Sequence, residues 1–123
     1  MNLLEKAKAY ANGGRILIDW IGHGGEPVST EKAQGRANTC ILCVNNSEGL
    51  QAAYDVAMAI KSQLELKNNL KLNVENEKEL KTCHLCLCPL KLKVWTPIEY
   101  ATKYRTTEEL KSYPGFCWLR NEQ

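Results

Sequence analysis

The sequence lacks the features that mark membrane and secreted proteins. It contains no apolar run of the length needed to cross a bilayer. Residues 1–6 are not followed by the apolar stretch and small-residue cleavage site of a signal peptide. We therefore expect a cytoplasmic protein without membrane contact, in a compartment where thiols stay reduced and bind metals rather than form disulfides.

The net charge is also small, and aromatic side chains are scarce. The chain has 16 Lys and Arg residues against 14 Asp and Glu residues, a net charge of +2 that does not require an anionic partner. Aromatic residues make up 7% of the chain, with a single Phe, so Leu, Ile, Ala and Val must supply most of the core. Such a core is modest, and a metal ion that binds only the folded state would stabilise it.

Motifs for common catalytic chemistry are missing. Gly22, Gly24 and Gly25 have neither the Lys-Ser/Thr ending of a phosphate-binding loop nor the dinucleotide-binding spacing. His23 lies in this glycine-rich turn, where a solvated imidazole is the simplest interpretation. His84 lies between two cysteines, a position whose side chain usually points away from a metal. No residue is therefore predicted to be catalytic.

Cysteine is abundant by contrast, and its spacing is informative. Two Cys-x-x-Cys pairs, separated by a helix-sized insert, offer four thiolates to one tetrahedral ion, most often zinc. We call Cys40 and Cys43 the first cysteine pair, and Cys83 and Cys86 the second. The simplest prediction is that these four hold one Zn²⁺, which leaves Cys88 and Cys117 over.

Other ligand sets remain open. All six cysteines would hold two zinc ions if two sulfurs bridge, or Cys88 and Cys117 would pack as small apolar side chains. Alternatively, the second pair, Cys88 and Cys117 form the site, and the first pair is a redox pair. The run Cys-x-x-Cys-x-Cys-Pro is similar to those of ferredoxins, but its spacing differs from theirs. Sites made only of cysteines are normally closed, so we expect a structural metal and no enzyme.

The pattern of apolar residues predicts several short elements. Helices are expected over residues 2–12, from Ser29 to about Asn38 and from about Glu48 to Lys67. Residues 15–21 fit either a buried strand or a helix. Alternation predicts a strand over residues 90–95 and a short one over 70–74. Capping boxes at Thr96 and Thr106 predict two short helices before the turn at residues 113–115.

Together these elements indicate a single α+β domain over residues 1–123, with a helical part (1–67) and a cysteine-rich part (80–120). We expect a metal site of the zinc-ribbon or treble-clef kind, several packed helices and a short β-hairpin that carries the second cysteine pair. A nucleic-acid interface is a second expectation, because Lys side chains alternate with an aromatic one on the predicted strand. Its residues would be Lys91, Lys93, Trp95, Lys103 and Arg105.

The segments around the cysteines show a resemblance. Arg36-Ala37-x-x-Cys40-x-x-Cys43, Cys83-x-x-Cys86-x-Cys88-Pro89 and Cys117-Trp118 together resemble uncharacterised small cysteine-rich proteins of phage and bacterial genomes. The resemblance covers roughly residues 15–120 and implies a zinc-finger-like fold, but no activity. We therefore expect a non-enzymatic scaffold or adaptor that binds another protein, in a phage particle or a phage-host complex. A nucleic-acid-binding zinc protein is the alternative.

Overall fold

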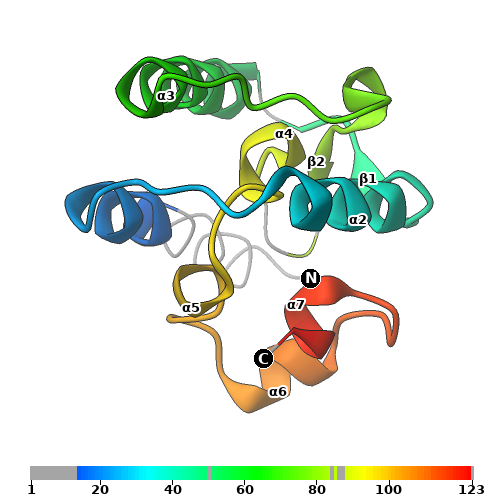
Figure 1. Cartoon of the computed structure of the whole chain (residues 1–123). Helices are drawn as coiled ribbons and strands as arrows, with labels where there is room; N and C mark the ends of the chain where they lie inside the picture. The colour runs from blue at the N-terminus through cyan, green and yellow to red at the C-terminus, as the bar shows by residue number, and fades with distance from the viewer. Residues whose placement is uncertain (1–13, 50, 84, 86–87, 123) are drawn as a thin grey trace.

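Short helices and one small sheet make up the fold (Figure 1). The computed structural model describes residues 14–49, 51–83, 85 and 88–122. Residues 14–22 are helical, and the elements that follow are α2 (Thr30–Ile41), β1 (Asn46–Ser47), α3 (Gln51–Asn68), the 3₁₀ turn η1 (Glu77–Glu79), β2 (Thr82–Cys83), α4 (Leu90–Lys93), α5 (Ile98–Ala101), α6 (Thr107–Lys111) and α7 (Trp118–Asn121). This mixture confirms the α+β class. The helix expected over residues 2–12 lies outside the described residues.

Helix α2 forms where the sequence predicts it. The Ser29 hydroxyl caps the helix by accepting a hydrogen bond from the Lys32 amide at 3.2 Å. Ala33, Ala37 and Cys40 follow one another at helical spacing and are all buried. The helix continues to Ile41, beyond the expected end near Asn38, so Cys40 lies in its last turn.

Helix α3 is the longest helix in the described part of the chain and contacts α4. The strand expected over residues 70–74 does not form. Leu72 is buried there, but its amide donates to the Glu65 carboxylate at 2.8 Å and not to a neighbouring strand. The Glu65 side chain of α3 thus accepts the backbone hydrogen bond that a neighbouring strand would otherwise accept. None of the helices in the described ranges is long and apolar enough to cross a membrane.

The sheet joins two distant parts of the sequence. β1 and β2 run antiparallel, with Asn46 opposite Cys83 and Ser47 opposite Thr82. The Asn46 side chain extends this pairing: it donates to the Glu79 carbonyl and accepts from the Lys81 amide, each at 2.8 Å. As a result, the residues after the first cysteine pair lie beside the start of the second.

The strand predicted over residues 90–95 was wrong. The Lys93 amide donates to the Pro89 carbonyl, and the Val94 amide to the Leu90 carbonyl, each at 3.1 Å, which is a helical pattern. Leu90, Leu92, Lys93 and Val94 are all buried. The alternation of Leu and Lys is therefore not a sign of one solvated face, because α4 lies inside the molecule (Figure 1).

The two predicted capping boxes behave differently. Thr106 caps α6 as expected, because its hydroxyl accepts from the Glu109 amide at 3.1 Å. Before α5, no side chain caps the helix, and Pro97 occupies the capping position. Thr96 is instead buried, with 2% of its surface exposed, and its carbonyl accepts from an arginine of α2.

That arginine, Arg36, links three parts of the fold from a buried position. The residue is 2% exposed, and its guanidinium donates to the carbonyls of Val94 at 2.9 Å and Thr96 at 2.7 Å. It also forms a forked ion pair with Glu122, at 3.1 and 2.8 Å. The Trp118 ring stacks on it at 4.0 Å. One side chain therefore fixes α2, the segment after α4 and the carboxy-terminal helix together.

Replacement of Arg36 tests this arrangement. We expect Arg36→Met to lower the free energy of unfolding by about 3 kcal/mol, because it leaves Glu122 and two buried carbonyls without their donor. Lys32→Met is the matched control, since Lys32 lies 3.7 Å from the same carboxylate but is half exposed. Its expected loss is below about 0.5 kcal/mol. Urea denaturation measures both, and equal losses would contradict the account.

Candidate metal centre

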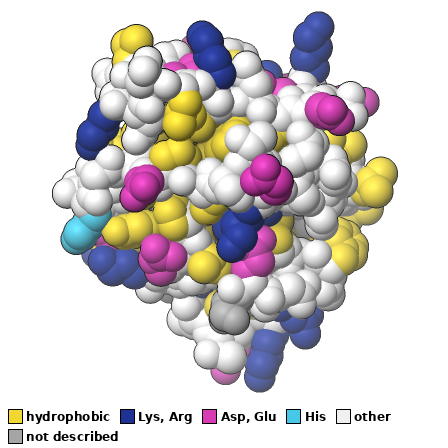
Figure 2. Space-filling view, in the orientation of Figure 1, with side chains coloured by type: hydrophobic (Ala, Val, Ile, Leu, Met, Phe, Trp, Pro, Cys, Tyr) yellow, Lys and Arg dark blue, Asp and Glu magenta, His cyan; other side chains and the backbone are white. Residues whose placement is uncertain are grey.

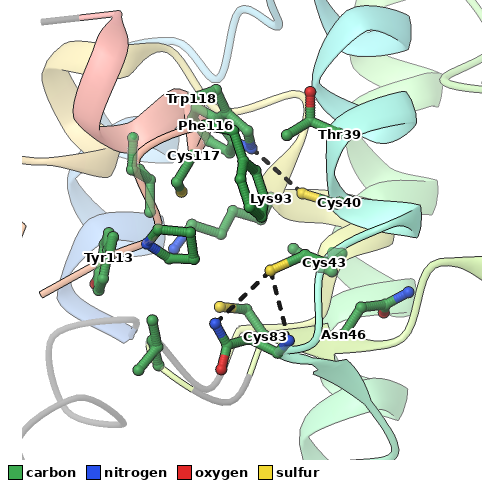
Figure 3. A pocket seen from close by; sticks show the side chains of 15 residues that line it. Thr39, Cys40, Cys43, Asn46, Cys83, Lys93, Tyr113, Phe116, Cys117 and Trp118 are labelled. Carbon is green, nitrogen blue, oxygen red and sulfur yellow. Dashed lines mark hydrogen bonds between the residues drawn. The ribbon is translucent and has the colours of Figure 1, made fainter.

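Four cysteines from three segments of the chain line one small cavity of about 30 Å³. They are Cys40 in the last turn of α2, Cys43 just after it, Cys83 in β2 and Cys117 before α7. We call this space the cysteine cavity. Figure 3 shows all four side chains around it, with Trp118 and Phe116 on the side of α7.

The backbone around the first cysteine pair is a compact turn. The Cys43 amide donates to the Cys40 carbonyl at 3.1 Å, and the Asn46 amide donates to the Cys43 carbonyl at 3.1 Å. The next residues enter β1, where Asn46 pairs with Cys83. The end of α2 and the sheet register together bring Cys43 and Cys83 to the same cavity.

Nitrogen–hydrogen groups point at two of the sulfurs. Cys43 Sγ accepts from the Asn45 amide at 3.5 Å and from the Asn45 side chain at 3.7 Å. Cys40 Sγ accepts from the Trp118 indole at 3.4 Å. Hydrogen bonds of this kind stabilise a negatively charged sulfur, the form that binds a metal.

The donor set of this cavity suits zinc in its chemistry. Four thiols line it, and no carboxylate occurs among its described lining residues. The described cysteines are not joined by disulfide bonds. The sulfurs do not form a closed ligand cluster, however: within the described ranges, no three Cys, His, Asp or Glu residues lie close enough together to hold a metal ion. Metal binding would require these side chains to turn further into the cavity.

The remaining predicted ligands lie elsewhere or outside the described residues. Cys86 and His84 belong to the part that the structure does not describe. Cys88 lines a different, largely apolar cavity of about 330 Å³ between residues 14–17, α3 and α4. Its carbonyl accepts from the Cys83 amide at 3.2 Å. The cysteine cavity thus contains Cys117 in addition to three of the four residues of the simplest predicted set.

The residues predicted to contact nucleic acid do not form one exposed face. Trp95 and Lys93 are buried, with 1% and 5% of their surface exposed. Lys91 donates to the Tyr54 hydroxyl at 2.8 Å. On the face shown in Figure 2, Lys and Arg side chains are scattered among Asp and Glu rather than gathered in a patch.

Lys103 and Arg105 are engaged within the chain. Lys103 lies 2.9 Å from the Asp19 carboxylate, which raises the pKa of Lys103. The pKa of Asp19 is lowered, first by the hydrogen bond from the Tyr104 hydroxyl and then by the one from Lys103. The Arg105 side chain is 2% exposed and lies 3.9 Å from Glu109. Lys103 thus joins the turn between α5 and α6 to the helical segment 14–22, and Arg105 joins it to α6.

Arg36 and Trp118 were quoted above as part of the resemblance, but neither was predicted to be a site residue. Arg36 follows Ala33 by three residues and precedes Cys40 by four, so it lies on the buried face of α2. An arginine on the buried face of a predicted helix indicates that its guanidinium has a partner inside the protein. Trp118 adjoins Cys117 in the sequence, but nothing in the pattern indicated that its indole reaches Cys40.

Comparison of this chain with known protein families, with curated proteins and with solved structures gives no match. The placement of its residues is therefore the basis for inferring its function.

The position of Cys83 depends on a close contact next to the sheet. The Gly49 backbone lies so near Thr82 that an added Cβ atom would come within 2.4 Å of the Thr82 hydroxyl and 2.7 Å of its Cβ. Thr82 is buried and directly precedes Cys83. A side chain at residue 49 would therefore force Thr82 or the backbone of residue 49 to move.

We expect Gly49→Ala to lower the free energy of unfolding by about 1–3 kcal/mol through this overlap. Gly35→Ala is the control, because a Cβ atom there would meet nothing within 4 Å and Gly35 lies inside α2. That change should stabilise the chain by about 0.5–1 kcal/mol. Thermal unfolding followed by circular dichroism gives both values, and a neutral Gly49→Ala would show that the contact is not needed.

Proposed function

We propose that this chain is a non-enzymatic, zinc-stabilised scaffold or adaptor that binds another protein. The observation that carries the proposal is the convergence of Cys40, Cys43, Cys83 and Cys117 on one cavity. Segments up to 77 residues apart in the sequence meet there, since Cys40 and Cys117 are both lining residues. A zinc ion bound by these thiols would hold α2, the sheet and the segment before α7 together.

A structural role fits this cavity better than a catalytic one. A catalytic zinc ion needs an open coordination position and a general base close by. The described lining residues include no carboxylate or imidazole, and Leu85, Leu90, Leu119 and Phe116 surround the thiols. Apolar walls with four thiols are typical of a closed structural site.

Exposed apolar side chains beside the cysteines support the binding of a protein partner. Leu42 and Val44 flank Cys43 and are 84% and 90% exposed, and Phe116, next to Cys117, is 56% exposed. Apolar groups that extend so far into water are favourable contacts for another protein. A metal-tied turn would present them in a fixed arrangement, which lowers the entropy cost of binding.

The proposed setting is a phage particle or a phage-host complex. This setting is inferred from the resemblance of the cysteine segments alone. The nucleic-acid alternative is less well supported by the structure. Of its five residues, Lys93 and Trp95 are buried, and Lys103 is ion-paired with Asp19.

Metal content per chain tests the zinc centre. We expect native mass spectrometry to find one zinc ion per chain, and Cys83→Ser to remove it and unfold or strongly destabilise the protein. Cys88→Ser is the matched control, because Cys88 lines the other cavity, and it should keep the ion. A protein without bound metal, or one that holds iron, would overturn the proposal.

The same measurement separates the two candidates for the fourth ligand. We propose Cys117, which lines the cysteine cavity, whereas the spacing alone favours Cys86. Cys117→Ser should therefore lose zinc and Cys86→Ser should retain it. The reverse result would restore the four cysteines of the two pairs as the ligand set.

Partner binding is tested at the exposed turn. The double variant Leu42→Ser/Val44→Ser should keep its zinc and its fold, because both side chains are almost fully exposed. We expect zinc-loaded wild type to capture a protein that this variant does not retain, and nuclease treatment to leave the capture unchanged. Equal capture by both proteins, or binding to DNA or RNA at low salt in place of a protein, would contradict the proposal.

A further inference from the structure

A polar cavity of about 190 Å³ lies where the start of α3 meets η1, β2 and α4 (Figure 1). Most of the side chains that line it are cations or hydrogen-bond donors. They include three ammonium groups, two hydroxyls and one amide, from Lys78, Lys81, Lys91, Tyr54, Thr82 and Gln51. We call this space the lysine cavity. It has no described lining residue in common with the cysteine cavity.

Positive charge dominates the lysine cavity. Its three ammonium groups stand against one carboxylate in the described lining, that of Glu48. This carboxylate lies 3.6 Å from Lys81, but the Glu48 side chain is 85% exposed, so water screens much of its charge. Gln51 is the first residue of the 18-residue helix α3, whose first turn contains no acidic side chain in the described part. The partial positive charge of this helix end adds to that of the lysines, so the cavity favours an anion.

Two of the donors are held in a fixed arrangement. The Lys91 ammonium group donates to the Tyr54 hydroxyl at 2.8 Å and lies 5.0 Å from the centre of the Tyr54 ring. This bond uses one N–H group of Lys91 and an oxygen lone pair of Tyr54, and it leaves the hydroxyl proton of Tyr54 for another acceptor. Both residues can therefore donate to the same anion.

The Thr82 hydroxyl indicates a ligand independently of the charges. Thr82 is only 7% exposed and lines the lysine cavity, and none of the described residues forms a hydrogen bond with its hydroxyl. A buried hydroxyl without a partner is costly, so such groups point to a ligand or water. Gly49 keeps the space beside it open, because a Cβ atom at residue 49 would lie 2.4 Å from the hydroxyl oxygen.

We propose that the lysine cavity binds a phosphate group, either free phosphate or the phosphate of a small molecule. A phosphate monoester carries a charge of about −1.5 to −2 at pH 7 and has three strong acceptor oxygens. The lysines supply the opposite charge, and the hydroxyls of Tyr54 and Thr82 supply directed hydrogen bonds. The cavity is smaller than the roughly 300–1,000 Å³ of sites for drug-sized ligands, which favours a ligand with a small substituent.

This binding function is separate from the zinc centre and from the adaptor role. Nucleic acid is a poorer fit than a small ligand, because it is bound through many phosphates along an extended basic surface. On the face shown in Figure 2, cations are instead scattered among carboxylates.

Titration of the ¹⁵N-labelled chain with inorganic phosphate and with glycerol 3-phosphate tests the proposal, with amide chemical shifts as the readout. We expect saturable shifts of amides at the lysine cavity, such as those of Gln51 and Thr82, and none with sodium chloride at equal ionic strength. Tighter binding of the ester identifies a phosphorylated small molecule as the ligand, and tighter binding of phosphate identifies the free ion. Shifts that do not saturate, or that chloride reproduces, would refute the proposal.

Three variants locate the binding site. Lys91→Met and Thr82→Val should each weaken binding by about 10–100-fold, because each removes a hydrogen bond to a charged group. Lys111→Met is the matched control, since it removes an exposed lysine of α6 that does not line the cavity. This control should bind within a few-fold of wild type.

The same variants separate a built site from general attraction to a basic chain. Equal weakening by Lys111→Met and Lys91→Met, or wild-type affinity of Thr82→Val, would contradict the proposal. Should Thr82→Val fail to fold, the exposed Lys78→Met takes its place with the same expectation. Binding of a short DNA or RNA by a chain that binds neither small phosphate would assign these lysines to nucleic acid and overturn the inference.

Discussion

The buried guanidinium of Arg36 is the interaction on which the arrangement of this chain depends. It bonds the carbonyls of Val94 and Thr96 and the carboxylate of Glu122, and it stacks on Trp118. Trp118 in turn donates to the sulfur of Cys40. The same contacts that dock the carboxy-terminal helix on α2 therefore bring Cys117 and Cys40 to one cavity, so core packing and the candidate metal centre are parts of one network.

A metal would complement a core of this composition. The described core is built mainly from small and aliphatic side chains, with Trp20, Trp95, Trp118 and Tyr113 as its aromatic members. The sheet has only two residue pairs, and α4, α5 and α7 have four residues each. Elements this short depend on tertiary contacts for their stability. A zinc ion that joins three of these segments would add stability at the place where regular secondary structure contributes least.

Local signals in the sequence were reliable where the determining contact was local. The Ser29 cap and the spacing of Ala33, Ala37 and Cys40 predicted α2, and Thr106 predicted α6. Non-local contacts explain the failures. Residues 90–95 looked like a half-solvated strand, but the tertiary fold buries Lys93 as well as the Leu side chains. For the site, the spacing of Cys40, Cys43 and Cys83 predicted three of the thiols that share the cavity. The fourth, Cys117, belonged to two of the alternative ligand sets, and the Arg36 and Trp118 contacts that bring it to the cavity are encoded by no local pattern.

Zinc bound by thiols of the three segments is the central claim, and X-ray absorption at the zinc edge tests it most directly. The account predicts about four sulfur neighbours at about 2.3 Å from the zinc ion, with no oxygen or nitrogen ligand. A first shell that contains water, carboxylate or imidazole ligands, or a protein in which no zinc is bound, would contradict it.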